Sequence, residues 1–429
     1  MEFLASLAGH PERCAPSIHV AGSKGKGSVT GMISSMLEAA GRRTARYMSP
    51  HVSDYRERIS LNSSFFDEET YRAAGGELRR IAESLGAENS GAGLFDPRRE
   101  EGEGPSFFEL LTLYFFLCAR RGGCDTMVLE TGLGGRLDST NIVDPLISAI
   151  TVIELEHTEF LGNTLAAVAG EKAGIIKPGR PLVLGEQPPE ALEVFRRRAA
   201  EKGSPLLYLP ETVRVENIRV HRDGTDFRLV FRQPGFFNAP LELSVPVPGA
   251  IQARNAALAV TALKKAFPDI GEEPVRRGLA RFKIPARFEL VSKEPPVIID
   301  GAHTPGSAAL CCETFCGLYG RGGILLFGCA ADKNAGAMAE VLLPHFSRVI
   351  ITTPGTFKVS EPERVYNLFR AAAAQPDLPP DRLVFVRETE TAIRQALARG
   401  RAEGLPVLGL GSFYLAAEIR AFCGREKEE

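Results

Sequence analysis

The sequence has almost no excess of charge of either sign. Its 51 lysine and arginine residues are matched by 53 aspartate and glutamate residues, and the formal net charge is −2. A protein that binds nucleic acid or a membrane surface through charge carries a clear excess of basic residues, so we expect neither partner. Long apolar runs are also lacking, because the stretch from Leu110 to Ala119 is too short and too interrupted to span a bilayer. An N-terminal signal peptide is not evident either, which predicts a cytoplasmic location.

Cysteine pairs at metal-binding or redox spacing are missing. The eight cysteines are scattered, and none forms a Cys-x-x-Cys pair. Cys311, Cys312 and Cys316 cluster in the sequence but have no neighbouring set of further ligands. We therefore expect reduced, buried or partly buried thiols of a cytoplasmic enzyme.

The length of the chain predicts two domains, because 429 residues exceed one typical core. We place the first at residues 1–284 and the second at residues 285–429, since Pro285 ends a helical pattern and a strand pattern follows. Residues 205–247 alternate apolar and polar positions in short runs, which predicts a small antiparallel meander in the first domain. The second domain reads as a smaller, doubly wound α/β unit of about five strands.

Residues 18–28 carry the strongest local signal. The apolar run Ile18 to Ala21 predicts a buried strand, and a helical pattern follows Ser28 and ends near Gly41. Between them lies Gly22-Ser23-Lys24-Gly25-Lys26-Gly27-Ser28. A strand, a glycine-rich turn and a helix make the layout of a phosphate-binding loop, in which Lys26 would contact phosphates and Ser28 a magnesium ion. The alternative is an ordinary glycine-rich turn.

Polar side chains follow the next strands of the same pattern. Glu130 ends the apolar run that begins at Thr126, and His157 follows the strand predicted from Ser148 to Ile153. Ser49 precedes a proline after another strand. Because α/β folds bind ligands at the carboxyl ends of strands, these residues are candidate magnesium ligands. A Ser-Pro turn and a core histidine are the alternatives for Ser49 and His157.

Taken together, the motifs resemble the folylpolyglutamate synthase/dihydrofolate synthase family within the Mur ligase superfamily. The resemblance runs from about residue 18 to the end of the chain. It rests on the glycine-rich loop and on the following ordered stretches: Ser49-Pro50-His51, Glu130 to Asn141, His157 to Gly162, Glu171 to Gly179, Asp300-Gly301-Ala302-His303, Asp332-Lys333 and Gly411 to Leu415.

The resemblance implies an N-terminal P-loop ATPase-like domain, a smaller Rossmann-like C-terminal domain and a monomer. The implied activity is an ATP-dependent ligase that adds L-glutamate to a folate or dihydropteroate carboxylate through an acyl phosphate. It implies ATP and two Mg²⁺ ions as cofactors, and three sets of site residues. Catalytic residues would be Lys26, His157, Lys172, Asp300 and His303; nucleotide-binding residues Gly22, Gly25, Lys26, Gly27, Ser28, Asn255, Arg287 and Asp300; metal ligands Ser28, Ser49, Glu130 and His157.

Three residues depart from the family pattern: Lys24 and Thr304 replace asparagines, and Glu156 replaces the aspartate before the histidine. The family usually has an additional helical segment ahead of the first strand, next to the pterin pocket. Two alternatives follow. A Mur-type cell-wall ligase usually has a further N-terminal domain, for which the residues before Ile18 leave no room, and an inactive nucleotide-binding relative would fit Lys24 and Thr304.

Lys172 lies in Glu171-Lys172-Ala173-Gly174-Ile175, where the family carries a carbamylated lysine. The resemblance therefore implies that CO₂ adds to the ε-amine of Lys172. A carbamate would replace a cation that repels Mg²⁺ by an oxygen donor that suits it. The alternative is an exposed helix lysine paired with Glu171 or Glu156.

Overall fold

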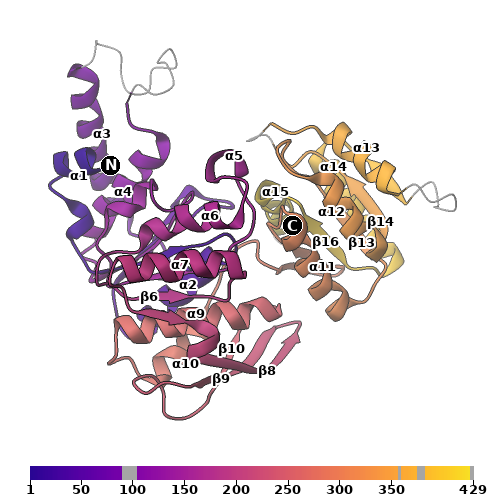
Figure 1. Cartoon of the computed structure of the whole chain (residues 1–429). Helices are drawn as coiled ribbons and strands as arrows, with labels where there is room; N and C mark the ends of the chain where they lie inside the picture. The colour runs from indigo at the N-terminus through magenta and orange to yellow at the C-terminus, as the bar shows by residue number, and fades with distance from the viewer. Residues whose placement is uncertain (89–103, 356–358, 374–381, 426–429) are drawn as a thin grey trace.

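The computed structural model describes residues 1–88, 104–355, 359–373 and 382–425, and it contains two α/β halves that lie next to each other (Figure 1). Residues 87–105 are rich in glycine, glutamate, asparagine and serine, which predicts a surface loop, but this segment falls almost wholly outside the described ranges. None of the described helices is long and apolar enough to cross a membrane.

The N-terminal half is built on a seven-stranded sheet in the order β3-β2-β4-β1-β5-β6-β7. All pairs are parallel except β2 with β3. Its strands are β1 (Ser17–Ala21), β2 (Thr44–Tyr47), β3 (Ile59–Leu61), β4 (Thr126–Glu130), β5 (Ile147–Ile150), β6 (Leu182–Leu184) and β7 (Leu206–Tyr208). The strand predicted from Ser148 to Ile153 thus ends at Ile150.

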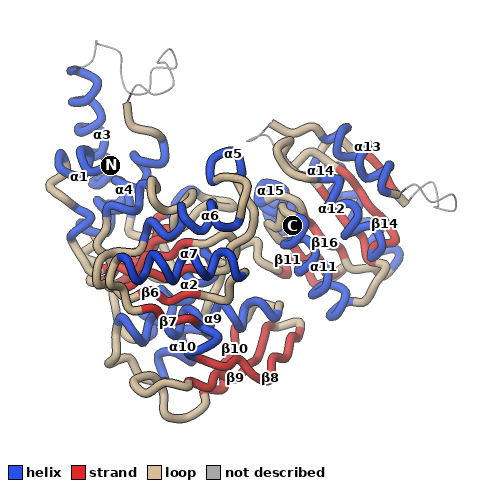
Figure 2. Tube along the Cα trace, viewed as in Figure 1, coloured by secondary structure: helices blue, strands red, loops and turns tan. Residues whose placement is uncertain are grey.

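Helices cover both faces of this sheet (Figure 2). They are α1 (Glu2–Leu7), α2 (Lys26–Ala39), α3 (Glu68–Glu88), α4 (Phe107–Arg121), α5 (Thr158–Leu161), α6 (Leu165–Lys172), α7 (Pro189–Glu201), α8 (Leu209–Thr212), α9 (Ala250–Ala266) and α10 (Glu272–Arg281). Short 3₁₀ turns are η1 (Pro11–Arg13), η2 (Tyr55–Arg58), η3 (Ser139–Ile142) and η4 (Ala173–Ile175).

Successive side chains along a strand point to opposite faces of the sheet, so the apolar side chains of each strand are shared between two hydrophobic clusters. Ile18 and Val20 of β1 join Val128 of β4 in a cluster with α2, α9 and α10. The alternate positions Met127 and Leu129 pack instead with α3 and α4. Both faces are therefore covered, and only the strand ends are left for polar chemistry.

The predicted meander is present as β8 (Val213–His221), β9 (Gly224–Phe231) and β10 (Leu241–Val245), which pair antiparallel. Arg222, in the turn between β8 and β9, reaches the C-terminal half. Its guanidinium donates to the carbonyl oxygen of Leu318 at 3.2 and 3.3 Å and lies 4.8 Å from the ring centroid of Tyr319. The meander therefore contacts the end of a helix in the other half.

The C-terminal half contains a six-stranded sheet in the order β11-β12-β16-β13-β14-β15. We predicted about five strands, and the additional one is β11, which pairs antiparallel with β12 at the edge. The strands are β11 (Glu289–Lys293), β12 (Pro296–Ile299), β13 (Gly323–Phe327), β14 (Phe346–Ile351), β15 (Leu383–Phe385) and β16 (Val407–Leu410).

The helices of this half are α11 (Pro305–Tyr319), α12 (Ala335–Leu342), α13 (Pro362–Ala372), α14 (Thr389–Glu403) and α15 (Phe413–Arg425), with the 3₁₀ turn η5 (Leu343–His345). Helices α11, α12 and α13 pack on one face of the sheet, and α14 and α15 on the other. The predicted α/β architecture of both halves is confirmed, whereas the boundary between residues 284 and 285 stays a prediction.

One expectation about the cysteines is wrong. We expected Cys311, Cys312 and Cys316 to lack a neighbouring ligand, but the fold brings His345 of η5 next to two of them, Cys312 and Cys316. The reason is topological: η5 follows α12 and returns the chain to the sheet beside α11. A ligand 29 residues away from Cys316 gives no signal in local spacing.

Candidate functional site

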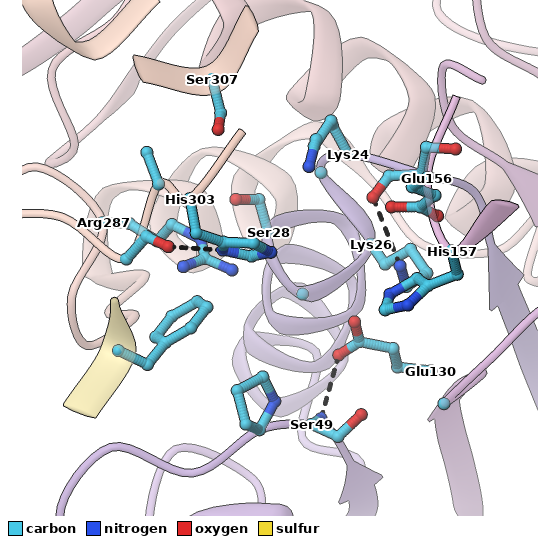
Figure 3. A pocket seen from close by; sticks show the side chains of 18 of the residues that line it. Lys24, Lys26, Ser28, Ser49, Glu130, Glu156, His157, Arg287, His303 and Ser307 are labelled. Carbon is cyan, nitrogen blue, oxygen red and sulfur yellow. Dashed lines mark hydrogen bonds between the residues drawn. The ribbon is translucent and has the colours of Figure 1, made fainter. Parts of the chain in front are cut away.

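A cavity of about 880 Å³ lies where the two halves meet, and both contribute to its lining. Nearly all predicted site residues line it: Gly25, Lys26, Gly27, Ser28, Ser49, Glu130, His157, Asn255, Arg287, Asp300 and His303. Gly22 and Lys172 are not part of the lining; Gly22 begins the glycine-rich loop, and Lys172 contacts its carbonyl oxygen. Figure 3 shows Lys26, Glu130 and His157 on one side of the cavity and Arg287 and His303 on the other.

The glycine-rich loop connects β1 to α2, as its sequence predicted. Gly22 has a φ of 140°, and a Cβ there would lie 1.8 Å from Oγ1 of Thr151. Gly25, at the start of α2, has a φ of 88°, and a Cβ there would lie 2.5 Å from Oδ1 of Asn255. These two positions accept only glycine, because a side chain would meet both backbone strain and a neighbouring group.

Lys26 turns back over its own loop. Its Nζ donates to the carbonyl oxygens of Gly22 at 2.9 Å and Ser23 at 3.4 Å. Ser28, two residues further along α2, is 2% exposed. An ammonium group and the free N–H groups at the start of a helix both attract phosphate oxygens, so this loop can bind a phosphate chain.

Glu130 is the buried carboxylate at the end of β4. Its Oε2 accepts a hydrogen bond from the backbone N–H of Ser49 at 3.2 Å, as the dashed line in Figure 3 shows. Burial raises the pKa of Glu130, and the charge of Lys26 works in the opposite direction. The carboxylate therefore depends on nearby positive charge to stay ionised, as expected for a group that binds a cation.

Lys172, at the end of α6, is 1% exposed. Its Nζ lies 2.9 Å from Oε1 of Glu156 and donates to the carbonyl oxygen of Gly22, also at 2.9 Å. Burial, followed by the charge of Lys26, lowers the pKa of Lys172 to about 8. The exposed-lysine interpretation is thus excluded, although Glu156 is the partner that it named.

Glu156 is surrounded by cations. Burial raises its pKa, but Lys26, Lys172 and Lys24 outweigh that effect and hold the pKa below its usual range. Both Lys24 and Glu156 are departures from the family pattern, and the charge of Glu156 also acts on the partly buried side chain of Lys24. The two residues that depart from the family pattern, Lys24 and Glu156, therefore interact through their charges.

The segment between the halves carries Arg287. Its guanidinium lies 4.3 Å from the ring centroid of Phe413, and burial lowers its pKa. The residues on both sides, Ala286 and Phe288, have positive φ values of 50° and 45°. Such conformations are costly for residues with a Cβ, so the surrounding contacts must hold them in place.

Asp300 supplies those contacts. Its Oδ2 accepts from the N–H of Phe288 and its Oδ1 from the N–H of Ala302, both at 2.8 Å. Burial raises the pKa of Asp300, and Arg287 opposes this effect. Asp300 therefore positions both the Arg287 segment and the loop that carries His303.

His303 precedes α11, and its Nδ1 lies 2.8 Å from the carbonyl oxygen of Gly301. Burial, with the charge of Lys24 second, lowers the pKa of His303 to about 4. Thr304 then caps α11, accepting a hydrogen bond from the N–H of Ser307 at 3.4 Å. The threonine that departs from the family pattern thus keeps the role that asparagine can fill at a helix start.

Two predicted residues have contacts that local sequence did not suggest. His157 starts α5 with a φ of 47°, and its exposed side chain excludes the core-histidine alternative. Asn255 donates to Oε1 of Gln252 at 3.2 Å and lies against Gly25.

The prediction also missed some residues of the site. Gln252, Lys333 and Phe413 line the cavity and were not among the predicted site residues. Of these three, only Gln252 could have been found from the sequence, because its spacing of three from Asn255 puts both residues on one helix face.

Apolar side chains form part of the cavity wall near α5. Leu137 and Phe160 line it while being 80% and 72% exposed, and Phe108 and Leu133 line it as well. Large apolar groups open to solvent mark binding surfaces for apolar or aromatic ligands. Phe107, the neighbour of Phe108 in the sequence, is not part of the lining and is 72% exposed.

Two family models match the chain. One describes the Mur ligase middle domain and matches residues 102–263, and the other describes the glutamate ligase domain of Mur ligases and matches residues 286–413. The chain is also 35% identical over 339 residues to the dihydrofolate synthase/folylpolyglutamate synthase of Bacillus subtilis (strain 168). That match covers 78% of this chain and 75% of the relative.

Two further proteins are similar over nearly the whole chain. The folylpolyglutamate synthase of Lacticaseibacillus casei is 31% identical over 418 residues, covering 93% of this chain and 94% of the relative. The solved structure of the Mycobacterium tuberculosis folylpolyglutamate synthase complexed with ADP has a TM-score of 0.87 and 27% identity, covering 98% and 93% of the two chains. Sequence and fold therefore agree on one group of relatives.

Proposed function

The chain belongs to the folylpolyglutamate synthase/dihydrofolate synthase family of Mur-type ligases, and we propose that it uses ATP to join L-glutamate to a folate or dihydropteroate. The observation that carries this proposal is the single cavity in which a phosphate-binding loop, a buried carboxylate and an apolar wall meet residues of the C-terminal half. A ligase of this kind needs all four together, because nucleotide, acceptor and amine must be held side by side.

The reaction consists of two transfers. A carboxylate oxygen of the acceptor attacks the γ-phosphorus of ATP, the bond to the β-phosphate oxygen breaks, and ADP leaves. The α-amine of glutamate then attacks the carbonyl carbon of the acyl phosphate, loses a proton, and inorganic phosphate leaves. Positioning and charge neutralisation supply most of the rate in such transfers, and Lys26 lies where it can neutralise the phosphates.

Magnesium fits the residues that are present. In the described ranges no group of three histidine, cysteine or acidic ligands gathers around Glu130. Mg²⁺ needs no such group, since it is usually held by one or two carboxylates, water and substrate phosphates. We propose Glu130, Ser28, Ser49 and His157 as the residues that hold it. When bound, it neutralises charge on the phosphate oxygens.

The C-terminal half would close the site. Arg287 lies on the segment that joins the halves, Asp300 follows β12 of the C-terminal sheet, and His303 lies on the loop before α11. We assign Arg287 to the nucleotide phosphates and His303 to the glutamate side, while Asn255 on α9 stays a predicted contact to the adenine side. Enclosure between two domains protects the acyl phosphate from water. A monomeric state and a cytoplasmic location also stay predictions.

The activity is tested by ADP release. We expect release that requires glutamate together with tetrahydrofolate, dihydropteroate or both, which also separates the monofunctional from the bifunctional case. Activity only with a cell-wall precursor would replace this assignment by the Mur-type alternative. Absence of turnover with every acceptor, despite nucleotide binding, would favour an inactive relative.

Carbamylation of Lys172 is the further chemical proposal at this site. The reaction needs the neutral amine, and a buried lysine with a pKa of about 8 provides a substantial neutral fraction near neutral pH. The new anion would replace the ammonium that now lies 2.9 Å from Glu156, so cations at the site must compensate for both charges. Lys24, Lys26 and bound Mg²⁺ are the available cations.

We expect the intact protein, kept in bicarbonate, to carry the added mass of one CO₂, and the carbamylated fraction to rise as the pH is raised through about 8. Lys172→Ala should lose activity and recover part of it with acetate, whose carboxylate substitutes for the carbamate. A plain lysine mass in active enzyme, measured under native conditions with bicarbonate present, would rule out the modification.

A further inference from the structure

A second group of possible ligands lies in the C-terminal half, outside the cavity lining. Cys312 and Cys316 are one turn apart on α11, and His345 ends η5. One ligand atom from each of the three lies within 4.8 Å of the other two. Cys312 is buried, and Cys316 and His345 are partly buried. None of the three lines the cavity of the proposed ligase site.

The surrounding contacts fix this arrangement without using the thiols or the imidazole. The N–H of Gly322 donates to the backbone carbonyl oxygen of His345 at 2.8 Å. Phe315 of α11 packs on Phe346, the residue after His345, with ring centroids 5.6 Å apart. The backbone and an aromatic pair therefore hold η5 against α11, and the thiols of Cys312 and Cys316 interact with each other.

One ring nitrogen of His345 has no partner. Nδ1 of His345 is buried, and no hydrogen bond reaches it within the described residues. A buried polar atom without a partner is destabilising, and native structures contain few of them. An imidazole that has an unpaired ring nitrogen and is grouped with two sulfur atoms is the feature of a ligand set rather than of an apolar core.

We propose that Cys312, Cys316 and His345 bind one Zn²⁺ ion. Two thiolates and an imidazole match the preference of zinc for sulfur and nitrogen. With Zn–S near 2.3 Å and Zn–N near 2.1 Å, the ligand atoms of a tetrahedral site lie roughly 3.5–3.8 Å apart. The present separations of up to 4.8 Å thus need to shrink by roughly 1.3 Å at most, which side-chain rotation provides.

The fourth position would be taken by water. Among the described residues no fourth histidine, cysteine or acidic group joins these three. Binding requires the thiols to lose their protons, so the affinity falls as the pH is lowered. The ion would connect α11 to η5 on the side of the helix away from the cavity, since Ser307, Cys311 and Thr314 occupy the cavity side.

The full-length protein, freed of metal by a chelator and then desalted, tests the site. Calorimetry with Zn²⁺ should show one site, and bound Zn²⁺ should raise the melting temperature by mass action. Co²⁺ serves as the visible probe, because thiolate ligation gives it intense charge-transfer and d–d absorption. The His345→Gln and Cys316→Ser variants should lose more than about 100-fold in affinity, since even changes beside metal ligands cost roughly 10–100-fold.

Cys14→Ser is the matched control, because Cys14 is an exposed cysteine in the N-terminal half and should leave binding unchanged. Near-ultraviolet circular dichroism establishes that each variant is folded. The proposal is overturned if Co²⁺ shows no sulfur charge transfer, or if folded His345→Gln binds Zn²⁺ as the wild type does. None of these readouts depends on ligase turnover, so a wrong assignment of the substrate would not affect them.

Discussion

Glu130→Gln should lose about two to three orders of magnitude in turnover and yet be at least as stable as the wild type. The loss follows because the amide removes the charge that would hold the cation on the transferring phosphoryl group, and electrostatic contacts of this kind are worth about that much. Stability should not fall, because the fold already disfavours the ionised form: burial raises the pKa of Glu130. Steady-state ADP release and thermal unfolding measure the two effects.

The matched control is Asp138→Asn, a second buried carboxylate at the same cavity. Its oxygens accept hydrogen bonds from the N–H groups of Leu133 at 2.8 Å and Thr140 at 3.0 Å and from Oγ1 of Thr140 at 2.5 Å. An amide can accept at only one of its two polar atoms, so we expect a loss of about 1–3 kcal/mol in unfolding free energy. Wild-type turnover in Glu130→Gln would refute the proposed role of Glu130.

Lys172→Met should both inactivate and destabilise the protein. In the unmodified protein, prepared without bicarbonate, the paired side chains of Lys172 and Glu156 are 2% and 11% exposed, and removing Lys172 leaves the charge of Glu156 buried without its partner. Breaking a buried pair in this way costs about 3 kcal/mol or more. Denaturant unfolding of Lys172→Met should therefore show a large decrease in midpoint at an unchanged slope.

The double variant Lys172→Met/Glu156→Gln separates the two effects. It leaves no unpaired charge, so most of the lost stability should return, because neutral replacements of a buried pair are often tolerated. Activity should not return, since the amine of Lys172 is still absent. Equal stability of the single and the double variant would mean that the Lys172–Glu156 pair is not what the single substitution disturbs.

The parts of the site that lie close to a strand end in the sequence were predictable. The loop from Gly22 to Ser28 and the acid at Glu130 each lie within a few residues of a strand end, so chain order alone indicated their place. The contact of Lys172 with Gly22 could not be read in the same way, although Glu156 was one of the two partners considered for an exposed Lys172. Its partners Gly22 and Glu156 are 150 and 16 residues away, and only packing of α6 behind the loop brings them together.

Contacts between residues far apart in the sequence also explain the other features that were not predicted. The edge strand β11 turns back antiparallel beside β12, and a bulge between Leu290 and Ser292 interrupts its alternation. A pattern of two-residue periodicity is lost at such a bulge. His345 and Cys316 belong to different elements, so the ligand group they form with Cys312 depends on tertiary structure alone.

The contact of Arg222 with α11 affects how this chain can be divided into pieces. The carbonyl oxygen of Leu318 is among the last four of the helix, which have no partner within the helix itself. A cation at that end also offsets the negative end of the helix dipole. A fragment that begins at residue 285 loses this cap and the stacking on Tyr319, together worth about 1–2 kcal/mol. Anyone expressing the C-terminal half alone should therefore supply a substitute cation near Leu318.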